Sequence, residues 1–145
     1  MIASKLRLYH RVQITAHRLR KAADRTVLEA TGVSTAQSAV LNIVAAGDSV
    51  TQRDVATALG LNDSALTAMT MRLMKLGLLD RARSEADSRA WTLNVTEEGL
   101  ATQRSARTAF TAINKRIEGA LSQDEITLLA GLLERLSVAF EETEA

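Results

Sequence analysis

Residues 50–80, VTQRDVATALGLNDSALTAMTMRLMKLGLLD, contain two apolar helix patterns separated by a tight turn. A first, short helix is expected to begin at Thr51, which has an acidic residue at the capping-box position three residues later. Gly60 begins the turn, and Asn62 caps a second helix that continues to about Leu76. Two short helices joined by a turn of about three to four residues containing Gly are the signature of a helix-turn-helix.

The second of these helices divides into two faces. Its expected buried face consists of Leu66, Met69, Leu73 and Leu76. Its expected outer face carries Ser64, Thr67, Ala68, Met71, Arg72 and Lys75. A recognition helix needs this division, because one face packs on the domain while the other enters the major groove. On this face, the hydroxyls can hydrogen-bond to base edges, and the side chains that carry methyl groups can contact thymine methyls. The two cations can bind phosphates. An ordinary amphipathic helix has the same pattern, so the helix alone does not decide.

A basic β-hairpin is expected directly after the helix-turn-helix. Residues 78–83 and 90–95 have strand character, and the segment between them is polar. Three arginines flank this loop or lie in it: Arg81, Arg83 and Arg89. A narrow minor groove has enhanced negative potential and accepts inserted arginine. Asp87 is expected to hold the loop by pairing with an arginine. A solvated hairpin with scattered charges is the alternative, but its position after a helix-turn-helix favours a DNA-binding wing.

Long helices are expected on both sides of this central region. A helix from about Ser4 to Glu29 carries one apolar stripe: Tyr9, Val12, Ala16, Leu19, Ala23 and Val27. A shorter helix is capped by Ser34 and ends at Gly47. Thr96 begins a helix to about Ala120, and Ser122 begins the last, to about Glu141. The last helix has one apolar side: Ile126, Leu129, Leu133, Leu136 and Phe140, widened by Leu128 and Leu132. The fold class is therefore mainly α, with a small β-hairpin.

Composition narrows the class of protein. The chain has 145 residues, of which 46% are hydrophobic and 3% aromatic, so a core must be aliphatic. The absence of cysteine excludes disulfides and thiolate metal sites. No apolar run approaches the roughly 18 residues of a membrane span, and no signal-peptide pattern is present. No P-loop, zinc-protease or dinucleotide motif is present. We expect a cytoplasmic binding protein rather than an enzyme, with no cofactor, metal or membrane partner.

Charge is distributed unevenly along the chain. The net charge is only +1, but residues 1–30 hold seven basic and two acidic side chains. Residues 97–145 hold five basic and nine acidic ones. Complementary surfaces and wide apolar faces on the terminal helices suggest a homodimer, whereas a self-contained bundle within one chain is the alternative. His10 and His17, seven residues apart, share a helix face with Gln13 and are candidates for binding an anion. Two boundary histidines with ordinary hydrogen bonds are the simpler alternative.

The motifs together resemble the multiple antibiotic resistance regulator (MarR) family. The family outline LTxxxxAxxLGLxxSxLTxxxxRLxxxGLLxR appears here as VTQRDVATALGLNDSALTAMTMRLMKLGLLDR, residues 50–81. The wing motif, D-x-R followed by L-T-x-x-G, appears as DSRAWTLNVTEEG, residues 87–99. Three positions depart from the pattern: Ala68 and Ser88 stand where many members carry arginine, and Val95 replaces a leucine.

The resemblance implies a single chain, 1–145, with two functional regions. Residues 1–30 and 97–145 form a helical dimerisation region, and residues 31–96 form the winged helix-turn-helix. It implies a homodimer on a pseudo-palindromic operator in double-stranded DNA, with recognition helices in successive major grooves and wings in the flanking minor grooves. Such a regulator is commonly a repressor, released when a small anionic aromatic effector binds a crevice between the two regions.

The same resemblance assigns roles residue by residue. Arg89 becomes the minor-groove contact with Asp87 beside it, and Ser64 and Thr67 become polar positions of the recognition helix. Gln52 and Arg53 are expected to contact the DNA backbone. The competing function is a winged-helix module for dimerisation or protein interaction with weak or no specific DNA binding, which Ala68 and Ser88 would favour. The sequence does not specify the operator, the effector or the regulated genes, nor whether the protein represses or activates.

Overall fold

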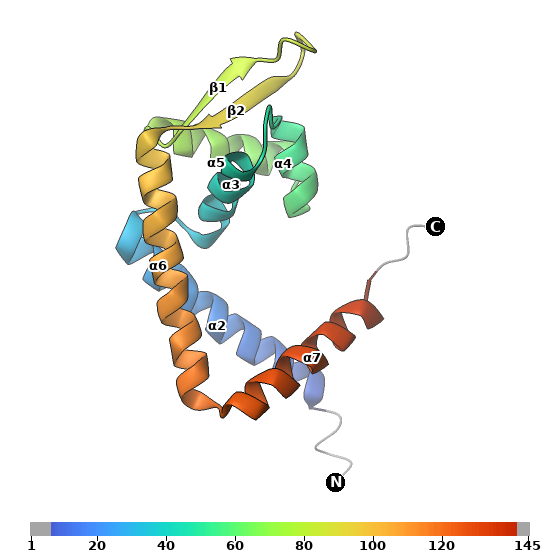
Figure 1. Ribbon diagram of the computed structural model, residues 1–145. Helices are drawn as coiled ribbons and strands as arrows, with labels where there is room; N and C mark the ends of the chain where they lie inside the picture. Colours follow the sequence, from blue (N-terminus) through green and yellow to red (C-terminus); the bar gives the residue numbers. More distant parts are fainter. Residues whose placement is uncertain (1–6, 142–145) are drawn as a thin grey trace. The chain divides into compact units, whose positions relative to one another are not determined.

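The computed structural model describes residues 7–141 and confirms a mainly helical fold with one two-stranded hairpin (Figure 1). The predicted helix start at Ser4 lies outside the described residues. The elements are α2 (Leu8–Thr31), α3 (Thr35–Ala46), α4 (Gln52–Leu59), α5 (Asp63–Lys75), β1 (Leu79–Arg83), β2 (Trp91–Val95), α6 (Glu97–Ala120) and α7 (Gln123–Ala139).

The chain packs into two compact units, which are described separately. The first ends at Phe110 and the second begins at Thr111, so the boundary falls inside α6. The first unit therefore contains the whole helix-turn-helix and the hairpin. This boundary is one of packing, and the predicted division into dimerisation and DNA-binding regions stays a prediction.

The helix starts follow the predicted capping residues. The Ser34 and Thr51 side chains each accept a hydrogen bond in a complete capping box, with Gln37 and Asp54 as the reciprocal partners. Asn62 accepts from the backbone N–H of Ala65 at 2.8 Å and so caps α5. These side chains satisfy backbone donors that have no partner within the helix. The positions of α3, α4 and α5 therefore follow from local sequence.

One apolar core joins these helices to the hairpin. Its fully buried side chains include Val55 from α4, Leu66 and Leu73 from α5, and Leu79 and Leu93 from the two strands. The members of this cluster all lie between residues 33 and 93. The recognition helix and the wing are thus held against the same aliphatic core.

The predicted buried face of α5 is partly wrong. Leu66 and Leu73 are fully buried and Met69 is half-buried, but Leu76 is 41% exposed. The reason is that Leu76 is the C-cap residue and the chain reverses at Gly77, whose φ of 74° is left-handed. Leu78 and Leu79 enter the core instead. Thr70, which the prediction missed, completes the buried face.

Thr70 is buried, and its hydroxyl is hydrogen-bonded. Its Oγ1 donates to the Thr67 carbonyl at 3.0 Å, within the helix itself. Burial is therefore tolerated, because a buried polar group that is hydrogen-bonded carries little penalty. Its spacing of four from Leu66 and three from Leu73 was the signal that could have identified it.

The hairpin is antiparallel and anchored to the helical body. Its register pairs Leu79 with Val95 at the base and Arg83 with Trp91 near the loop. The Leu93 backbone N–H donates to the Val50 carbonyl at 2.8 Å, which ties β2 to the segment before α4. The strands match the prediction to within one residue. The loop spans residues 84–90, one residue longer than the segment between the two predicted strands.

A close contact joins the end of α5 to the start of α6. The Thr96 hydroxyl donates to the Gly77 carbonyl at 2.7 Å and accepts from the Gly99 backbone N–H at 3.0 Å. A Cβ at Gly99 would lie 2.1 Å from the Leu78 carbonyl oxygen, so only glycine fits there. The C-terminal end of α5 is thereby fixed to the first turn of α6.

The predicted apolar stripes on the terminal helices are largely uncovered in one chain. Val27 at the end of α2 packs with Ala106 and Ala109 of α6 in a second small core. Ala23 is half-buried, and the rest of the stripe is open, with Tyr9 69% exposed. Helix α7 has no buried residue and ends two residues earlier than predicted, at Ala139. Its exposed large apolar side chains are Leu128, Leu129, Leu132, Leu133, Leu136 and Val138, with Phe140 at its C-cap.

The capping box of α4 makes the stability of the fold vary with pH in the acidic range. Hydrogen bonds from the backbone N–H of Thr51, and secondly from its hydroxyl, hold the pKa of Asp54 below the ordinary value of 3.8. A carboxyl with a lowered folded pKa stabilises the fold above its unfolded pKa and loses that contribution as pH falls. We expect Asp54→Asn to lower the melting temperature at neutral pH, with the deficit disappearing below about pH 4.

The measurement is thermal unfolding followed by circular dichroism between pH 2 and 7. Asp63→Asn is the matched control, since it removes an acidic side chain from the first turn of the next helix, where Asn62 supplies the cap. A deficit for Asp54→Asn that stays constant down to pH 2 would contradict the assignment of its carboxylate as the reciprocal cap.

Candidate nucleic-acid interface

The outer face of α5 is open as predicted. Ser64, Ala68, Met71, Arg72 and Lys75 are exposed and Thr67 is half-buried. Arg72 and Lys75 lie in the last turn, where positive charges interact favourably with the negative end of the helix dipole. The helix therefore presents small and polar groups first and two cations at its far end.

The two hydroxyls near the start of α5 have defined roles inside the protein. The Ser64 hydroxyl donates to the Asn62 side-chain oxygen at 2.9 Å, and the Thr67 hydroxyl donates to the Asp63 carbonyl at 2.7 Å. Gln52 Nε2 donates to the Thr67 hydroxyl at 2.8 Å, which joins the first residue of α4 to α5. Because each hydroxyl donates its own proton within the chain, each can only accept from an external group, and the oxygen of the half-buried Thr67 already accepts from Gln52. Arg53 follows Gln52 and is exposed.

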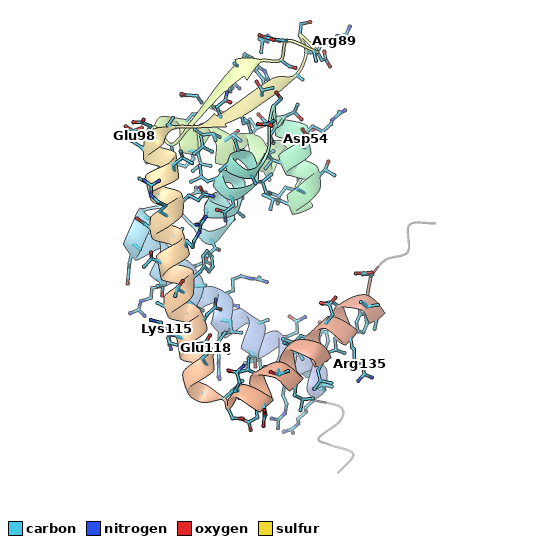
Figure 2. The ribbon with its side chains drawn as sticks, in the orientation of Figure 1. Asp54, Arg89, Glu98, Lys115, Glu118 and Arg135 are labelled. Atoms are coloured by element: carbon cyan, nitrogen blue, oxygen red, sulfur yellow. The ribbon has the colours of Figure 1, made fainter. Side chains whose placement is uncertain are left out.

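The end of the wing is fixed by its own backbone and by Asp87. Figure 2 shows Arg89 at the far end of the hairpin from the helical body, and its side chain is exposed. Asp87 Oδ1 accepts from the Arg89 backbone N–H at 2.9 Å. Asp87 therefore holds the loop through the backbone amide of Arg89, and no ion pair between Asp87 and an arginine side chain is found within residues 7–141. The guanidinium of Arg89 is left to extend outward.

The other two wing arginines stack on the indole of Trp91. The Arg81 and Arg83 guanidinium carbons lie 4.3 and 4.4 Å from the centre of the ring. Arg83 Nη1 also donates to the Ser88 carbonyl at 2.6 Å. Trp91 thus packs within the hairpin, and Arg83 has a structural partner that sequence spacing did not reveal.

The residues expected to bind a ligand do not come together in a cavity. His10, Gln13 and His17 are all exposed on α2, and His10 makes an edge-to-face contact with the ring of Tyr9 at 5.6 Å between centroids. Asp24, on the same side of the helix, accepts hydrogen bonds from the backbone and hydroxyl of Thr35. That interaction joins α2 to the start of α3 and is structural.

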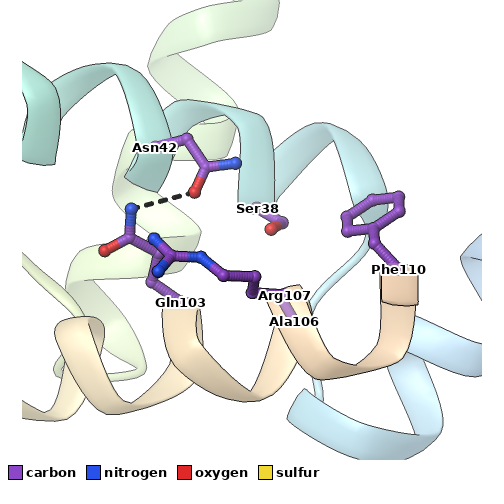
Figure 3. Close-up of a pocket in the computed structure, with 6 residues that line it drawn as sticks. All are labelled: Ser38, Asn42, Gln103, Ala106, Arg107 and Phe110. Atoms are coloured by element: carbon purple, nitrogen blue, oxygen red, sulfur yellow. Dashed lines mark hydrogen bonds between the residues drawn. The ribbon is translucent and has the colours of Figure 1, made fainter. Parts of the chain in front are cut away.

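A pocket of about 300 Å³ lies instead between α3 and α6 (Figure 3). Its lining residues are Ser38 and Asn42 from α3 and Gln103, Ala106, Arg107 and Phe110 from α6. Gln103 Nε2 donates to the Asn42 side-chain oxygen at 3.0 Å across it. The pocket combines a cation, two amides, a hydroxyl and an aromatic ring, and its volume is at the lower end of the range for small-molecule sites.

Ser38 is the unusual residue of this pocket. Its side chain is 1% exposed, and its Oγ has no hydrogen-bond partner among the described residues. A buried hydroxyl without a partner costs about 1–3 kcal/mol, so a partner supplied from outside would be favourable. Sequence reasoning missed this pocket because its polar residues come from helices more than 60 positions apart, and each set looks like an ordinary half-polar helix face.

Other classes of site were searched in residues 7–141. No group of three or more His, Asp or Glu side chains in that range is arranged to hold a metal ion. In the same range, no helix is long and apolar enough to cross a membrane.

Comparison with known proteins agrees with this geometry. The MarR family model matches residues 31–90, the segment from the end of α2 to the wing. A transcriptional regulatory protein assigned to the hcr operon of Thauera aromatica is 27% identical over 121 residues, which cover 83% of this chain and 73% of that protein.

Solved structures extend the likeness to nearly the whole chain. The PcaV transcriptional regulator of Streptomyces coelicolor, in complex with its natural ligand, is 30% identical with a TM-score of 0.72, covering 88% of this chain and 92% of that one. The fold is also that of S. aureus MepR in a DNA complex, at 20% identity and a TM-score of 0.81, covering 92% and 98%. The chain belongs to the MarR family of winged helix-turn-helix, DNA-binding transcriptional regulators.

Proposed function

We propose that the protein is a homodimeric repressor that binds a pseudo-palindromic operator and is released by a small aromatic anion. The observation that carries the DNA-binding assignment is the wing end, where Asp87 fixes the backbone of an exposed Arg89. The function is binding rather than catalysis. The homodimer and the release by a ligand each rest on a separate feature of the structure.

DNA contact is assigned to α5, the start of α4 and the wing. The exposed Ser64 hydroxyl, as an acceptor, matches the amino groups that adenine and cytosine present in the major groove, and Thr67, whose oxygen already accepts from Gln52, lies on the same face. Arg72 and Lys75 are placed to contact phosphates, as is Arg53 at the start of α4. Ala68, where many relatives carry arginine, supplies a methyl group instead of a cation. That change favours contact with a thymine methyl and reduces the number of phosphate contacts.

Removing the wing cation is the direct test of this assignment. We expect Arg89→Ala to weaken operator binding about tenfold and to lower the slope of log affinity against log salt by about one unit. Gel-shift titrations on the promoter of its own gene, at two salt concentrations, measure both quantities. Arg104→Ala, which removes an exposed arginine from α6, is the control and should match the wild type.

Two outcomes would contradict the proposal in different ways. Unchanged affinity of Arg89→Ala would show that the wing assignment is wrong. If the wild-type protein bound no neighbouring intergenic DNA specifically, the alternative of a winged-helix interaction module would be favoured.

The homodimer is proposed from the uncovered helices. Helix α7 buries none of its residues, yet Leu129, Leu133 and Leu136 lie along one side of it. Contiguous exposed apolar faces of this kind mark protein interfaces, and symmetric self-association is the commonest arrangement. The open part of the α2 stripe supplies a second such face.

We expect charges on this face of α7 to separate the subunits. Light scattering after size exclusion should give about twice 15.7 kDa for the wild type. The double variant Leu129→Glu/Leu133→Glu should shift toward the monomer mass, because two carboxylates would be buried without partners. Thr127→Glu introduces the same residue on the opposite side of α7 and should remain dimeric. A dimeric double variant would exclude α7 from the interface.

The effector site is proposed in the pocket between α3 and α6. Arg107 and the amides of Asn42 and Gln103 suit a carboxylate, while Phe110 offers an aromatic face. Ser38 supplies a buried hydroxyl that lacks a partner. The pocket residues of α6 lie about two to four turns from the Thr96 junction, so a ligand that separates α3 from α6 would act on the end of α5.

Ser38→Ala has a signature of two opposite signs. We expect it to raise the melting temperature of the free protein, because it removes a buried hydroxyl that costs about 1–3 kcal/mol. We also expect it to reduce the stabilisation by benzoate, the probe chosen as the simplest aromatic carboxylate. Thermal shift and titration calorimetry measure the two effects. Ala39→Ser, the neighbouring half-buried position outside the pocket lining, is the control. An unchanged response of Ser38→Ala to benzoate, where the wild type responds, would remove Ser38 from the site.

A further inference from the structure

The peptide group between Ser88 and Arg89 is held at both of its polar atoms. Its carbonyl oxygen accepts from Arg83 Nη1 at 2.6 Å. Its N–H donates to Asp87 Oδ1 at 2.9 Å. These two bonds restrain the orientation of this peptide plane, and the next amide is bonded as well, since the Ala90 N–H donates to the Asp87 carbonyl at 3.0 Å, so the Cα of Arg89 lies between two restrained peptide groups. Arg83 therefore acts on Arg89 without touching it.

Arg83 is itself held in place by Trp91. The two residues are direct partners in the hairpin register, so their side chains lie on the same face of the ribbon. The Arg83 guanidinium carbon lies 4.4 Å from the ring centre of Trp91, and that of Arg81, two residues earlier on the same face, lies 4.3 Å from it. Nearer the base, this face carries the buried Leu79 and Leu93. Beyond these core residues, the same face is covered by Arg81 and Arg83 stacked on Trp91.

The two stacked arginines differ in what else they bind. Arg83 donates to the Ser88 carbonyl, whereas no hydrogen bond from the Arg81 side chain is found within residues 7–141. Stacking leaves the edge of a guanidinium open to donate. Arg81 is thus positioned to reach an external acceptor, and Arg83 is already occupied.

We propose that Arg83 and Trp91 are positioning residues that preset the wing for DNA, and that Arg81 alone of the stacked pair contacts phosphate. The inference rests on the proposed role of Arg89 in the minor groove. Ordering a loop on binding costs affinity, so a loop that is ordered beforehand binds more tightly.

The free protein provides the first test, independent of DNA. Trp91 is the only tryptophan, so its fluorescence reports on the stack alone. Lysine keeps the charge but cannot stack as a plane and reach the Ser88 carbonyl together. We expect Arg83→Lys to increase quenching of Trp91 by acrylamide and to speed hydrogen exchange of the Arg89 amide. Equal exchange in Arg83→Lys and wild type would overturn the proposal.

DNA binding provides the second test, with Arg81→Lys as the matched control two residues away. We expect Arg83→Lys to weaken operator binding about 3- to 10-fold with the salt slope unchanged, since no charge is lost. Arg81→Lys should change affinity less than about twofold, because an ammonium also binds phosphate. Trp91→Leu should weaken binding about threefold or more through loss of the stack.

The outcomes separate this inference from the proposed function. Weak binding by Arg89→Ala together with wild-type binding by Arg83→Lys and Trp91→Leu would overturn the positioning role and leave the wing assignment intact. Equal losses in Arg81→Lys and Arg83→Lys would also overturn it. Melting temperatures equal to that of the wild type show that each variant is folded, and the exchange measurement decides the matter even if no operator is bound.

Discussion

The structure depends on one aliphatic core that buries side chains from the recognition helix and from the hairpin together. Leu66 and Leu73 of α5 and Leu79 and Leu93 of the strands are almost fully buried in the same cluster. Each such side chain contributes about 1.5–3 kcal/mol relative to exposure. Because α5 and the hairpin both pack on these few residues, the positions of the two elements depend on one another.

Around this core the polar groups divide into those that fix geometry and those left outward. Thr96 joins the end of α5 to α6, Gln52 joins α4 to α5, and Asp87 fixes the wing backbone. Arg72, Lys75 and Arg89 remain exposed. A surface with prepositioned donors loses less entropy on binding. The pocket between α3 and α6 differs from these fixed contacts, because the buried Ser38 hydroxyl there has no hydrogen-bond partner within residues 7–141.

Local signals in the sequence were reliable where local chemistry controls the structure. The capping residues Ser34, Thr51 and Asn62 were predicted correctly because their partners lie three residues away. Strand alternation gave the hairpin to within one residue. The prediction was wrong at Leu76. This residue continues the apolar periodicity of α5, but it is the C-cap and comes directly before the turn at Gly77. The sequence also did not reveal that Asp87 would bond to the backbone amide of Arg89 rather than to a guanidinium.

The sequence by itself determined the order of the elements, their ends, the family, and which faces of the helices are apolar. All of these follow from residues within a few positions of one another or from a spaced motif. Only the tertiary structure decided which groups on different elements come together. Ser38 and Arg107 line one pocket, and Arg83 contacts both Trp91 and the Ser88 carbonyl. Such contacts depend on the angle and register at which elements pack. Those are set by the volume of the whole core, which no single stretch of sequence encodes.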